Sequence, residues 1–390
     1  MKRRSTILLS LFLLLSAGIF PSCSKEEPET ATVQPVRTGA ILPLTGTLAN
    51  YGELEKRGLD LAMQHVNDAG GIGGRPLEIL YEDSELDPKK AISAFNKLVS
   101  VDKVEMITGV VGSSVCLALA PLATREKIVF ISGGATSPKL TGSSPYFFRV
   151  APSDTVGAAR LVDWALEEGS SKIAILVVEN DYGIGQKDVA VARLAELGKE
   201  PVIVESVIPD TSDLRPQIER IRKAKPDTIF LLTHATEAAY YLKQAKEAGF
   251  SVQAYGGDSL TDPSLVEIAG EATEGVRYLL PAKGSGPRYD AYAAAYRAAY
   301  NEEPEALGLK TYSLAHIAVE ALRDAEGTGQ SLRDYLASRE FDTAMGVVRF
   351  DEGGDIVDAR FDRLVYRDGE AVPFGIEADA SETAEESNAA

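Results

Sequence analysis

The feature that most constrains the fold is a regular alternation of short apolar runs with segments of helical periodicity. Residues 173–178 form a continuous apolar run, which is typical of a parallel strand buried on both faces. A succession of such strands and helices predicts an α/β fold whose parallel sheets are covered by helices on both sides. In the helix before this run, the apolar residues recur at a spacing that places them on one face, namely Ala158, Leu161, Val162, Ala165 and Leu166.

The same alternation extends through most of the chain. Helices are predicted over residues 54–66 and 88–101, and the first of them is followed by the helix-stopping sequence Asn-Asp-Ala-Gly-Gly. The remaining short apolar runs predict strands over residues 38–44, 77–82, 105–108, 128–132, 202–207, 228–232 and 252–255.

The central part of the chain, about 340 residues, is too long for one hydrophobic core, and this length favours two lobes. The alternation falls into two sets, residues 37–153 and 154–281. After Pro281 two or three helices come in succession, and short strands follow near residues 346–350 and 360–366. If the chain crosses back, these helices complete the first lobe and the strands complete the second. Periodicity alone does not show that crossing.

The N-terminus indicates export. Lys2 and two arginines precede an apolar stretch over residues 7–15, which is too short to span a membrane, and Phe-Pro-Ser-Cys follows. This pattern predicts a signal peptide over residues 1–22. Cys23 fits a bacterial lipoprotein signal, in which the acylated thiol anchors the protein to the cell envelope at its periplasmic or extracellular face. An ordinary signal peptide with an incidental cysteine is the alternative. Residues 23–36 are predicted to form a flexible tether.

Composition excludes further classes of protein. The formal net charge of −18 repels nucleic acid, so we expect no nucleic-acid partner. No second apolar run is long enough to span a membrane. Cys116 lies among apolar residues and is predicted to be a buried thiol rather than a nucleophile. Residues 377–390 are acidic and rich in small side chains, which predicts a disordered tail.

Three predicted strands end in sequences that could hold a ligand, because ligands of parallel α/β sheets bind at the carboxyl ends of strands. The first ends at Ser113, which could offer a hydroxyl and a backbone N–H to a carboxylate. The second ends in a Gly-Gly pair that includes Gly134, followed by the hydroxyl of Thr136. The third ends at Asp258, which could take an ammonium. Taken singly, turn formation and helix capping explain each of them at least as well.

Several short motifs follow one another in the order found in a known family. They are Ile-Leu-Pro-Leu-Thr-Gly from Ile41, Asn-Asp-Ala-Gly-Gly-Ile-Gly-Gly-Arg from Asn67, Ser-Gly-Gly-Ala-Thr-Ser-Pro from Ser132, Asn-Asp-Tyr-Gly from Asn180 and Asp-Pro-Ser-Leu from Asp262. On this ordered set, the sequence resembles the branched-chain amino-acid-binding (Leu/Ile/Val-binding) family of type I periplasmic binding proteins, the solute receptors of ABC importers.

The resemblance implies an α/β fold of two Rossmann-like lobes with parallel central sheets, joined by three hinge strands. It implies an N-terminal lobe of residues 37–153 plus 282–344 and a C-terminal lobe of residues 154–281 plus 345–376. The solute is expected to dock on the first lobe, and the second lobe then closes over it.

The resemblance also assigns ligand-binding positions. Ser113 and Thr136 match positions that hold a ligand carboxylate through hydroxyl and backbone N–H groups. Gly134 matches a carbonyl that accepts from the ligand ammonium, and Asp258 falls where a longer acidic residue pairs with that ammonium. The ligand is therefore expected to be an amino acid, branched-chain or otherwise neutral, since a buried carboxylate and a buried ammonium each need partners. Four further residues are expected around the ligand: Ala135, Tyr51, Tyr182 and His234.

Other functions of the same fold stay open. An amide or aromatic acid needs no acidic partner at Asp258, which could then be a helix cap. The protein could also report its ligand to a membrane receptor or kinase. Catalysis is disfavoured, because the chain has three histidines without metal-ligand spacing, no Gly-x-Ser-x-Gly elbow and no Walker loop. We therefore expect no catalytic residue, metal or cofactor. The expected state is a monomer whose partners are a small solute, ABC permease subunits and the membrane.

Overall fold

The computed structural model describes residues 33–375, and its strands form two large sheets and one hairpin. The first sheet has the strand order β2-β1-β3-β4-β5, and all of its neighbouring strands are parallel. Its strands are β1 (Val36–Leu42), β2 (Leu77–Asp83), β3 (Met106–Val110), β4 (Phe130–Ser132) and β5 (Phe147–Arg149).

The second sheet has the strand order β14-β13-β10-β9-β8-β6-β7. Its first five strands in sequence are parallel, and β13 and β14 extend it in antiparallel fashion at the β10 edge. The strands are β6 (Ile173–Val178), β7 (Ile203–Val207), β8 (Thr228–Leu232), β9 (Gln253–Gly256), β10 (Arg277–Pro281), β13 (Phe361–Arg367) and β14 (Glu370–Pro373).

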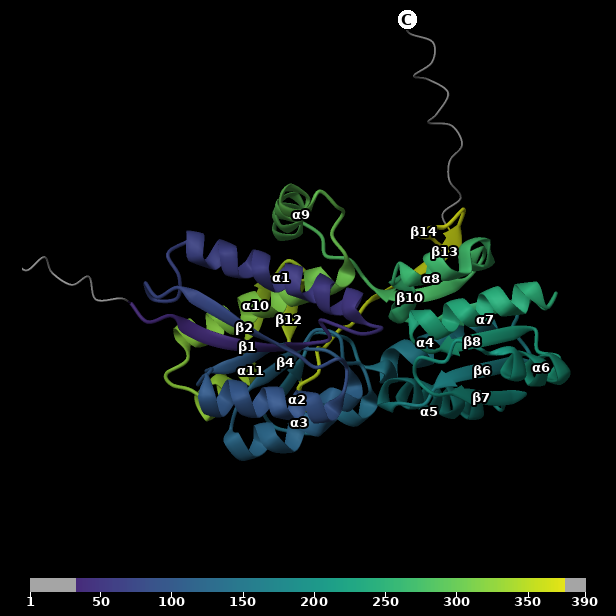
Figure 1. Cartoon of the computed structure of the whole chain (residues 1–390), viewed down its shortest axis with the longest axis horizontal. Coiled ribbons are helices and arrows are strands. Elements are labelled where there is room, and N and C mark those ends of the chain that lie inside the picture. The colour runs from purple at the N-terminus through teal and green to yellow at the C-terminus, as the bar shows by residue number, and fades with distance from the viewer. Residues whose placement is uncertain (1–32, 376–390) are drawn as a thin grey trace, which may run out of the picture. The chain divides into compact units, whose positions relative to one another are not determined.

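Helices flank both sheets (Figure 1). Those near the first sheet are α1 (Ala49–Asp68), α2 (Pro88–Asn96), which continues as one π-helical turn (Lys97–Val101), α3 (Ser113–Glu126), α9 (Pro287–Tyr300), α10 (Ala306–Asp324) and α11 (Gln330–Ser338). Those near the second sheet are α4 (Asp154–Glu167), α5 (Asp181–Glu196), α6 (Arg215–Ala224), α7 (Ala235–Glu247) and α8 (Ser264–Ala269). Three short 3₁₀ turns complete the set: η2 (Pro138–Leu140), η3 (Asp258–Thr261) and η4 (Gly270–Thr273).

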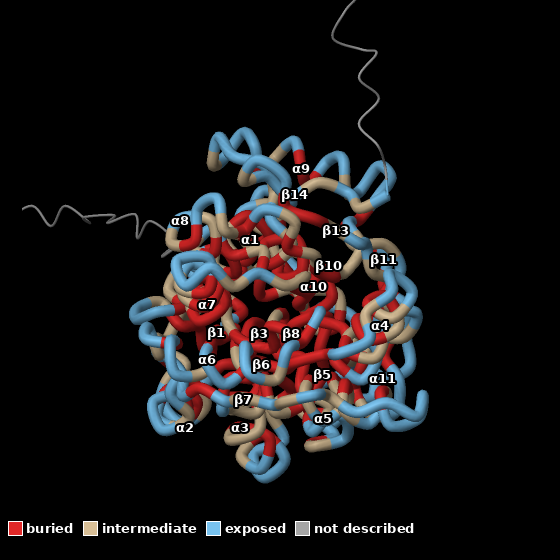
Figure 2. Tube along the Cα trace, turned by 90° about the vertical axis from the view of Figure 1, so that its right-hand side faces the viewer, coloured by how far each residue is buried: buried red, intermediate tan, exposed pale blue. Residues whose placement is uncertain are grey.

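Each sheet has its own hydrophobic core, and Figure 2 shows buried segments along the central strands and exposed ones on the outer helices. The first core combines β1 to β5 with α1, α2, α3, α10 and α11. The second sheet has one core on each face, because Leu176 and its neighbours pack on one side and Ile175 packs with Trp164 on the other. Burial on both faces explains why residues 173–178 are apolar without interruption.

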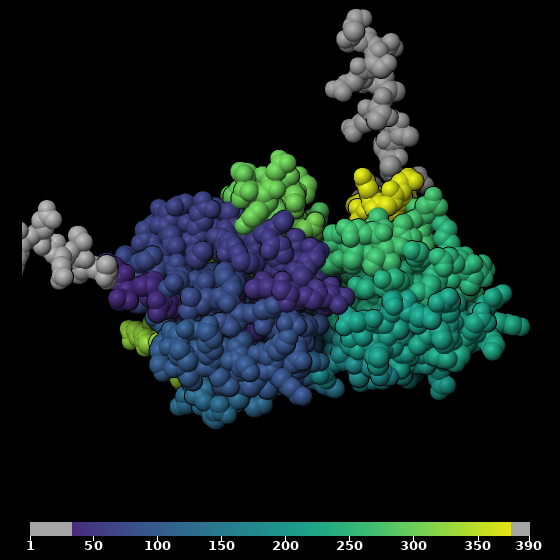
Figure 3. All heavy atoms as spheres, viewed as in Figure 1, coloured from purple at the N-terminus to yellow at the C-terminus, as the bar shows by residue number. Residues whose placement is uncertain are grey.

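The chain passes between the two sheets three times: after β5, after β10 and before β13. The second passage brings α10 and α11 back to the first core, where α10 packs along α1, and α9 packs beside them in a small cluster of its own. The two helices approach closely, since a Cβ on Gly58 would lie 2.2 Å from the carbonyl oxygen of Gly308. The space-filling view shows the green α9 beside the purple-blue surface around α1 (Figure 3). The crossing that periodicity left open therefore occurs.

One boundary differs from the prediction. The hairpin of β11 (Glu340–Thr343) and β12 (Gly346–Arg349) belongs to the first core, because Val348 and Phe350 are buried in it and Phe350 packs edge-on against Phe148. The expected division at residue 344 left β11 in the first lobe but assigned β12 to the second, whereas the passage to the second sheet comes only before β13. Short apolar strands carry no signal for which of two cores they join.

The other predicted elements lie within a few residues of their expected bounds, and the parallel α/β architecture is confirmed. Val36, assigned to the tether, is buried and begins β1. The predicted signal peptide, Cys23 and the acidic tail lie outside the described residues. Cys116 is fully buried, and burial raises the pKa of its thiol to about 12. Between residues 33 and 375, no helix is long and apolar enough to cross a membrane.

Candidate functional site

A cavity of about 750 Å³ lies between residues of the two sheets and gathers most of the predicted site. Loops at the carboxyl ends of β1, β2, β3 and β4 line it from the first sheet, and those after β6, β7, β8 and β9 line it from the second. Its volume is in the range of small-molecule sites. The predicted residues that line it are Tyr51, Ser113, Gly134, Tyr182, His234 and Asp258.

The N-terminus of α3 faces this cavity through Gly112, Ser113, Ser114 and Val115. Gly112 adopts a φ of +95°, and a Cβ there would lie 2.5 Å from the Cδ1 of Leu86. The first backbone N–H of this turn with an intrahelical acceptor is that of Cys116, so the preceding N–H groups of the turn are available to a ligand. Together with the Ser113 hydroxyl, which accepts from the N–H of Ser137 at 3.2 Å, they form a setting for a carboxylate.

Two predicted residues lie elsewhere. The structure does not bring Ala135 to the cavity, because Ala135 is fully buried, its N–H donates to the Ser132 hydroxyl at 3.0 Å, and its carbonyl accepts from Arg149 at 3.3 Å. Thr136 lies at a second, much smaller cavity of about 30 Å³. The sequence motif placed both beside Gly134, but adjacent residues of a turn point in different directions.

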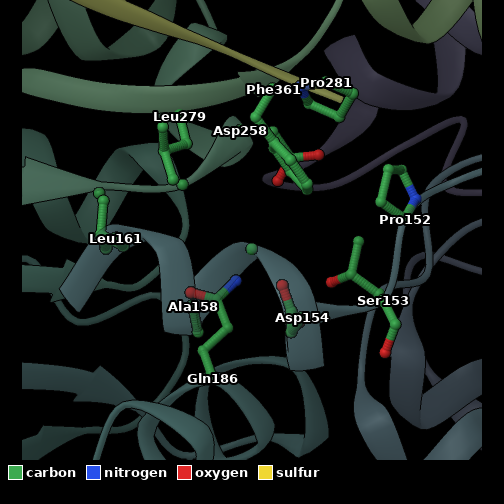
Figure 4. Close-up of a pocket in the computed structure, with 14 residues that line it drawn as sticks. Pro152, Ser153, Asp154, Ala158, Leu161, Gln186, Asp258, Leu279, Pro281 and Phe361 are labelled. Atoms are coloured by element: carbon green, nitrogen blue, oxygen red, sulfur yellow. The ribbon is translucent and has the colours of Figure 1, made fainter. Parts of the chain in front are cut away.

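The small cavity has a mainly apolar lining with a few polar side chains, and it adjoins the three passages between the sheets (Figure 4). Asp154, Gln186 and Asp258 border it, and its volume fits about one water molecule. Burial raises the pKa of Asp154 to about 7, although Thr136 and Gln186 lower it in part. Asp258 is the residue that lines both cavities.

Asp258 has a partner that the sequence analysis missed. The Nζ atom of Lys310, on α10, lies 3.6 Å from the Oδ2 atom of Asp258, and the Lys310 side chain is only 3% exposed. The sequence did contain a sign of this residue, because a charged side chain lies on the apolar face of α10 that is formed by Leu307, Leu314 and Ile317. A lysine is almost never buried without a partner, so its position should have directed attention to an acid nearby.

The aromatic wall comes from the second sheet. The rings of Tyr182 and His234 are stacked with centroids 5.2 Å apart, and the Nε2 of His234 is 3.0 Å from the side-chain nitrogen of Asn180. Burial lowers the pKa of His234 to about 4, so this ring is neutral at pH 7 and offers no charge to a ligand. The Tyr182 hydroxyl is buried and has no hydrogen-bond partner among the described residues.

Several contacts join the residues that line the cavity from the first sheet to those that line it from the second, and these two sets of residues are the two walls of the cavity. The Tyr51 hydroxyl donates to the carbonyl of Ser259 at 3.1 Å. On the other side, Asp181 accepts from the Ser114 hydroxyl at 2.8 Å and pairs with Lys139 at 3.0 Å. With these contacts in place, a solute in the cavity is covered by groups from both sheets, which excludes water and strengthens its polar contacts.

The comparisons with known proteins agree with this geometry. The sequence profile described as "Periplasmic binding protein" matches residues 35–361. This chain belongs to the periplasmic binding protein family. The resemblance predicted from the ordered motifs is confirmed, and so is the type I periplasmic binding protein fold.

Among its relatives in this family is the leucine-, isoleucine-, valine-, threonine- and alanine-binding protein of Pseudomonas aeruginosa, which is 27% identical over 94% of this chain and 97% of its own. The structure of a leucine-binding protein from Thermotoga maritima matches with a TM-score of 0.80 and 25% identity, over 87% of this chain and 97% of that one. A solute-binding protein of Rhodopseudomonas palustris in complex with 3,4-dihydroxybenzoic acid matches with a TM-score of 0.77 and 25% identity, over 87% and 95%. All three are described as binding proteins, two of them by the amino acids they bind.

Proposed function

We propose that this chain is the solute receptor of an ABC importer and that it captures a small organic carboxylate in the 750 Å³ cavity. The observation that carries the proposal is the N-terminus of α3, where the Ser113 hydroxyl and N–H groups that lack a backbone acceptor among residues 33–375 face the cavity. The sequence predicts an amino acid, and relatives named for amino acids support that class. The 3,4-dihydroxybenzoic acid bound to another relative has a carboxylate, as amino acids do, but no ammonium.

The proposed mechanism is closure of the second sheet's wall over a solute bound to the first. The solute carboxylate docks at Ser113, and the contacts of Tyr51 with Ser259 and of Ser114 with Asp181 hold the two walls together. Because the solute touches both walls only when they meet, it shifts the population toward the closed form. A permease that prefers this form then receives loaded receptors.

Lipid anchoring through Cys23 is part of the proposal. We expect cells supplied with a labelled fatty acid to label the wild-type protein and not the Cys23→Ser variant. A label that survives this substitution would place any acyl chain elsewhere, and no label on either protein would leave an ordinary signal peptide as the interpretation.

Thermal unfolding with a panel of solutes tests the binding function. Purified protein is first unfolded in denaturant and refolded, which removes carried-over solute. A solute at a hundred times its dissociation constant adds about 2.7 kcal/mol of stability, which corresponds to a shift of a few degrees for a protein of this size. The panel contains amino acids, aliphatic and aromatic acids, and the amides of the same acids.

We expect the Ser113→Ala variant to lose about tenfold or more in affinity for the best solute, because one hydrogen bond to a charged group is removed. Ser93→Ala, on the exposed surface of α2, is the matched control and should bind like the wild type. Binding of amides as tight as that of the acids, or full affinity in Ser113→Ala, would contradict a carboxylate site at α3.

A further inference from the structure

We infer that Lys310 occupies with its own ammonium the place beside Asp258 that the ammonium of an amino acid would take, so that this cavity selects carboxylates without an α-ammonium. The inference rests on the proposed function, since it concerns the same cavity and names the class of solute within it. Aliphatic and aromatic carboxylic acids are that class.

The first step is the pairing of Lys310. Its side chain is 3% exposed, and an ammonium so deeply buried is costly unless an anion balances it. Among residues 33–375, the ion pair found for Lys310 is the one with Asp258, at 3.6 Å. Lys310 lies on α10 beside the first sheet, whereas Asp258 follows β9 of the second and lines the cavity, so the pair links the two sheets behind the cavity residue Asp258.

The second step concerns Glu55, the other acid near Lys310. Glu55 is fully buried, and neither carboxylate oxygen has a hydrogen-bond partner among the described residues. Its Oε1 lies 2.8 Å from where a Cβ on Gly134 would be, so Glu55 sits behind the Gly-Gly turn and does not line the cavity. Burial raises the pKa of Glu55 to about 8, although Lys310 lowers it in part. At neutral pH Glu55 is therefore mostly protonated, and Asp258 remains the counterion of Lys310.

The third step is the charge that a solute meets. The pair of Lys310 and Asp258 is neutral in sum, and the nearby His234 is neutral as well. An incoming ammonium at Asp258 would lie close to the ammonium of Lys310 in a poorly hydrated space, where like charges repel strongly. The small cavity on the other side of Asp258 offers about 30 Å³, which is room for one water. A solute that carries only a carboxylate, bound at α3, brings no second ammonium beside Lys310.

Matched solute pairs test the inference. Leucine is compared with 4-methylpentanoate, and phenylalanine with 3-phenylpropanoate, by calorimetric titration of refolded full-length protein. The members of each pair differ only by the ammonium. We expect the acid of the pair that fits the cavity to bind at least roughly tenfold more tightly than its amino acid. An amino acid that binds more tightly than its acid would overturn the inference and leave the proposed function standing, whereas a failure of every carboxylate in the wider panel would overturn both.

Lys310→Met supplies a second readout, because it removes the ammonium and keeps the length of the side chain. We expect the preference to move toward the amino acid by at least roughly tenfold, since Asp258 then lacks a counterion. Lys283→Met, an exposed lysine, is the control for lost charge and should keep the wild-type preference. An unchanged preference in folded Lys310→Met would contradict the inference. If that variant does not fold, the matched pairs decide with the wild-type protein alone.

Discussion

Replacing Arg149 with methionine is expected to destabilise the protein by about 3–5 kcal/mol, because it breaks a buried ion pair and leaves the partner charge behind. Arg149 is fully buried at the end of β5, and its Nε and Nη2 atoms bind the two carboxylate oxygens of Asp355 at 2.6 and 2.8 Å. Its Nη1 atom donates to the carbonyl of Ser137 at 2.9 Å. This one side chain therefore fastens the turn after β4 and the segment after β12 to the first sheet.

Chemical denaturation at neutral pH measures the effect. The matched control is Arg215→Met, since Arg215 pairs with Asp213 on the exposed surface and such pairs contribute about 1 kcal/mol or less. A loss below about 1 kcal/mol in Arg149→Met would mean that the segment around Asp355 is not held in the way described.

Replacing Glu55 with glutamine is expected to flatten the pH dependence of stability. The folded-state pKa of Glu55 is raised to about 8 by burial, whereas the unfolded-state pKa is near 4.5, so the folded protein binds the extra proton between these values. The stabilisation from this proton is complete below about pH 4.5 and is lost as the pH rises toward 8. One such group gives a slope of about 1.4 kcal/mol per pH unit, downward with increasing pH.

Denaturation series between pH 5 and 8 check this expectation. Asp154, with a pKa of about 7, contributes a slope of the same sign. The unfolding free energy of the variant should therefore fall with pH by about 1.4 kcal/mol per pH unit less than that of the wild type, and the part of the slope that comes from Asp154 should remain. Glu53→Gln, on the exposed side of the same helix, should keep the wild-type slope. A Glu55→Gln variant with the wild-type slope would show that Glu55 is ionised in the folded protein, and it would weaken the argument that Lys310 has Asp258 as its counterion.

Much of the fold could be predicted from the sequence because the buried faces of strands and helices determine the spacing of apolar residues along the chain. Strand β6 lies between two layers of helices and is therefore apolar at every position, and α4 shows its buried face at helical spacing. The return of α10 to the first core could not be read from spacing, since an apolar helix face does not indicate which sheet it covers. Strand β12 was assigned to the wrong core for the same reason.

The candidate site could be predicted in part. Ser113, Gly134 and Asp258 follow strands whose carboxyl ends meet, so their approach to one cavity follows from the topology. Ala135 and Thr136 belong to the same motif, but the local turn directs them elsewhere. Lys310 and Glu55 lie on helices far from these strands in sequence, and their positions behind the site follow only from the packing of α1 with α10.

The most direct test of solute capture is a crystal structure with the carboxylate that gives the largest thermal shift. The account predicts electron density for the solute in the cavity lined by Tyr51, Tyr182 and His234, with its carboxylate within hydrogen-bond distance of Ser113 and the first N–H groups of α3. A solute bound outside this cavity, or one whose carboxylate points away from α3, would contradict it.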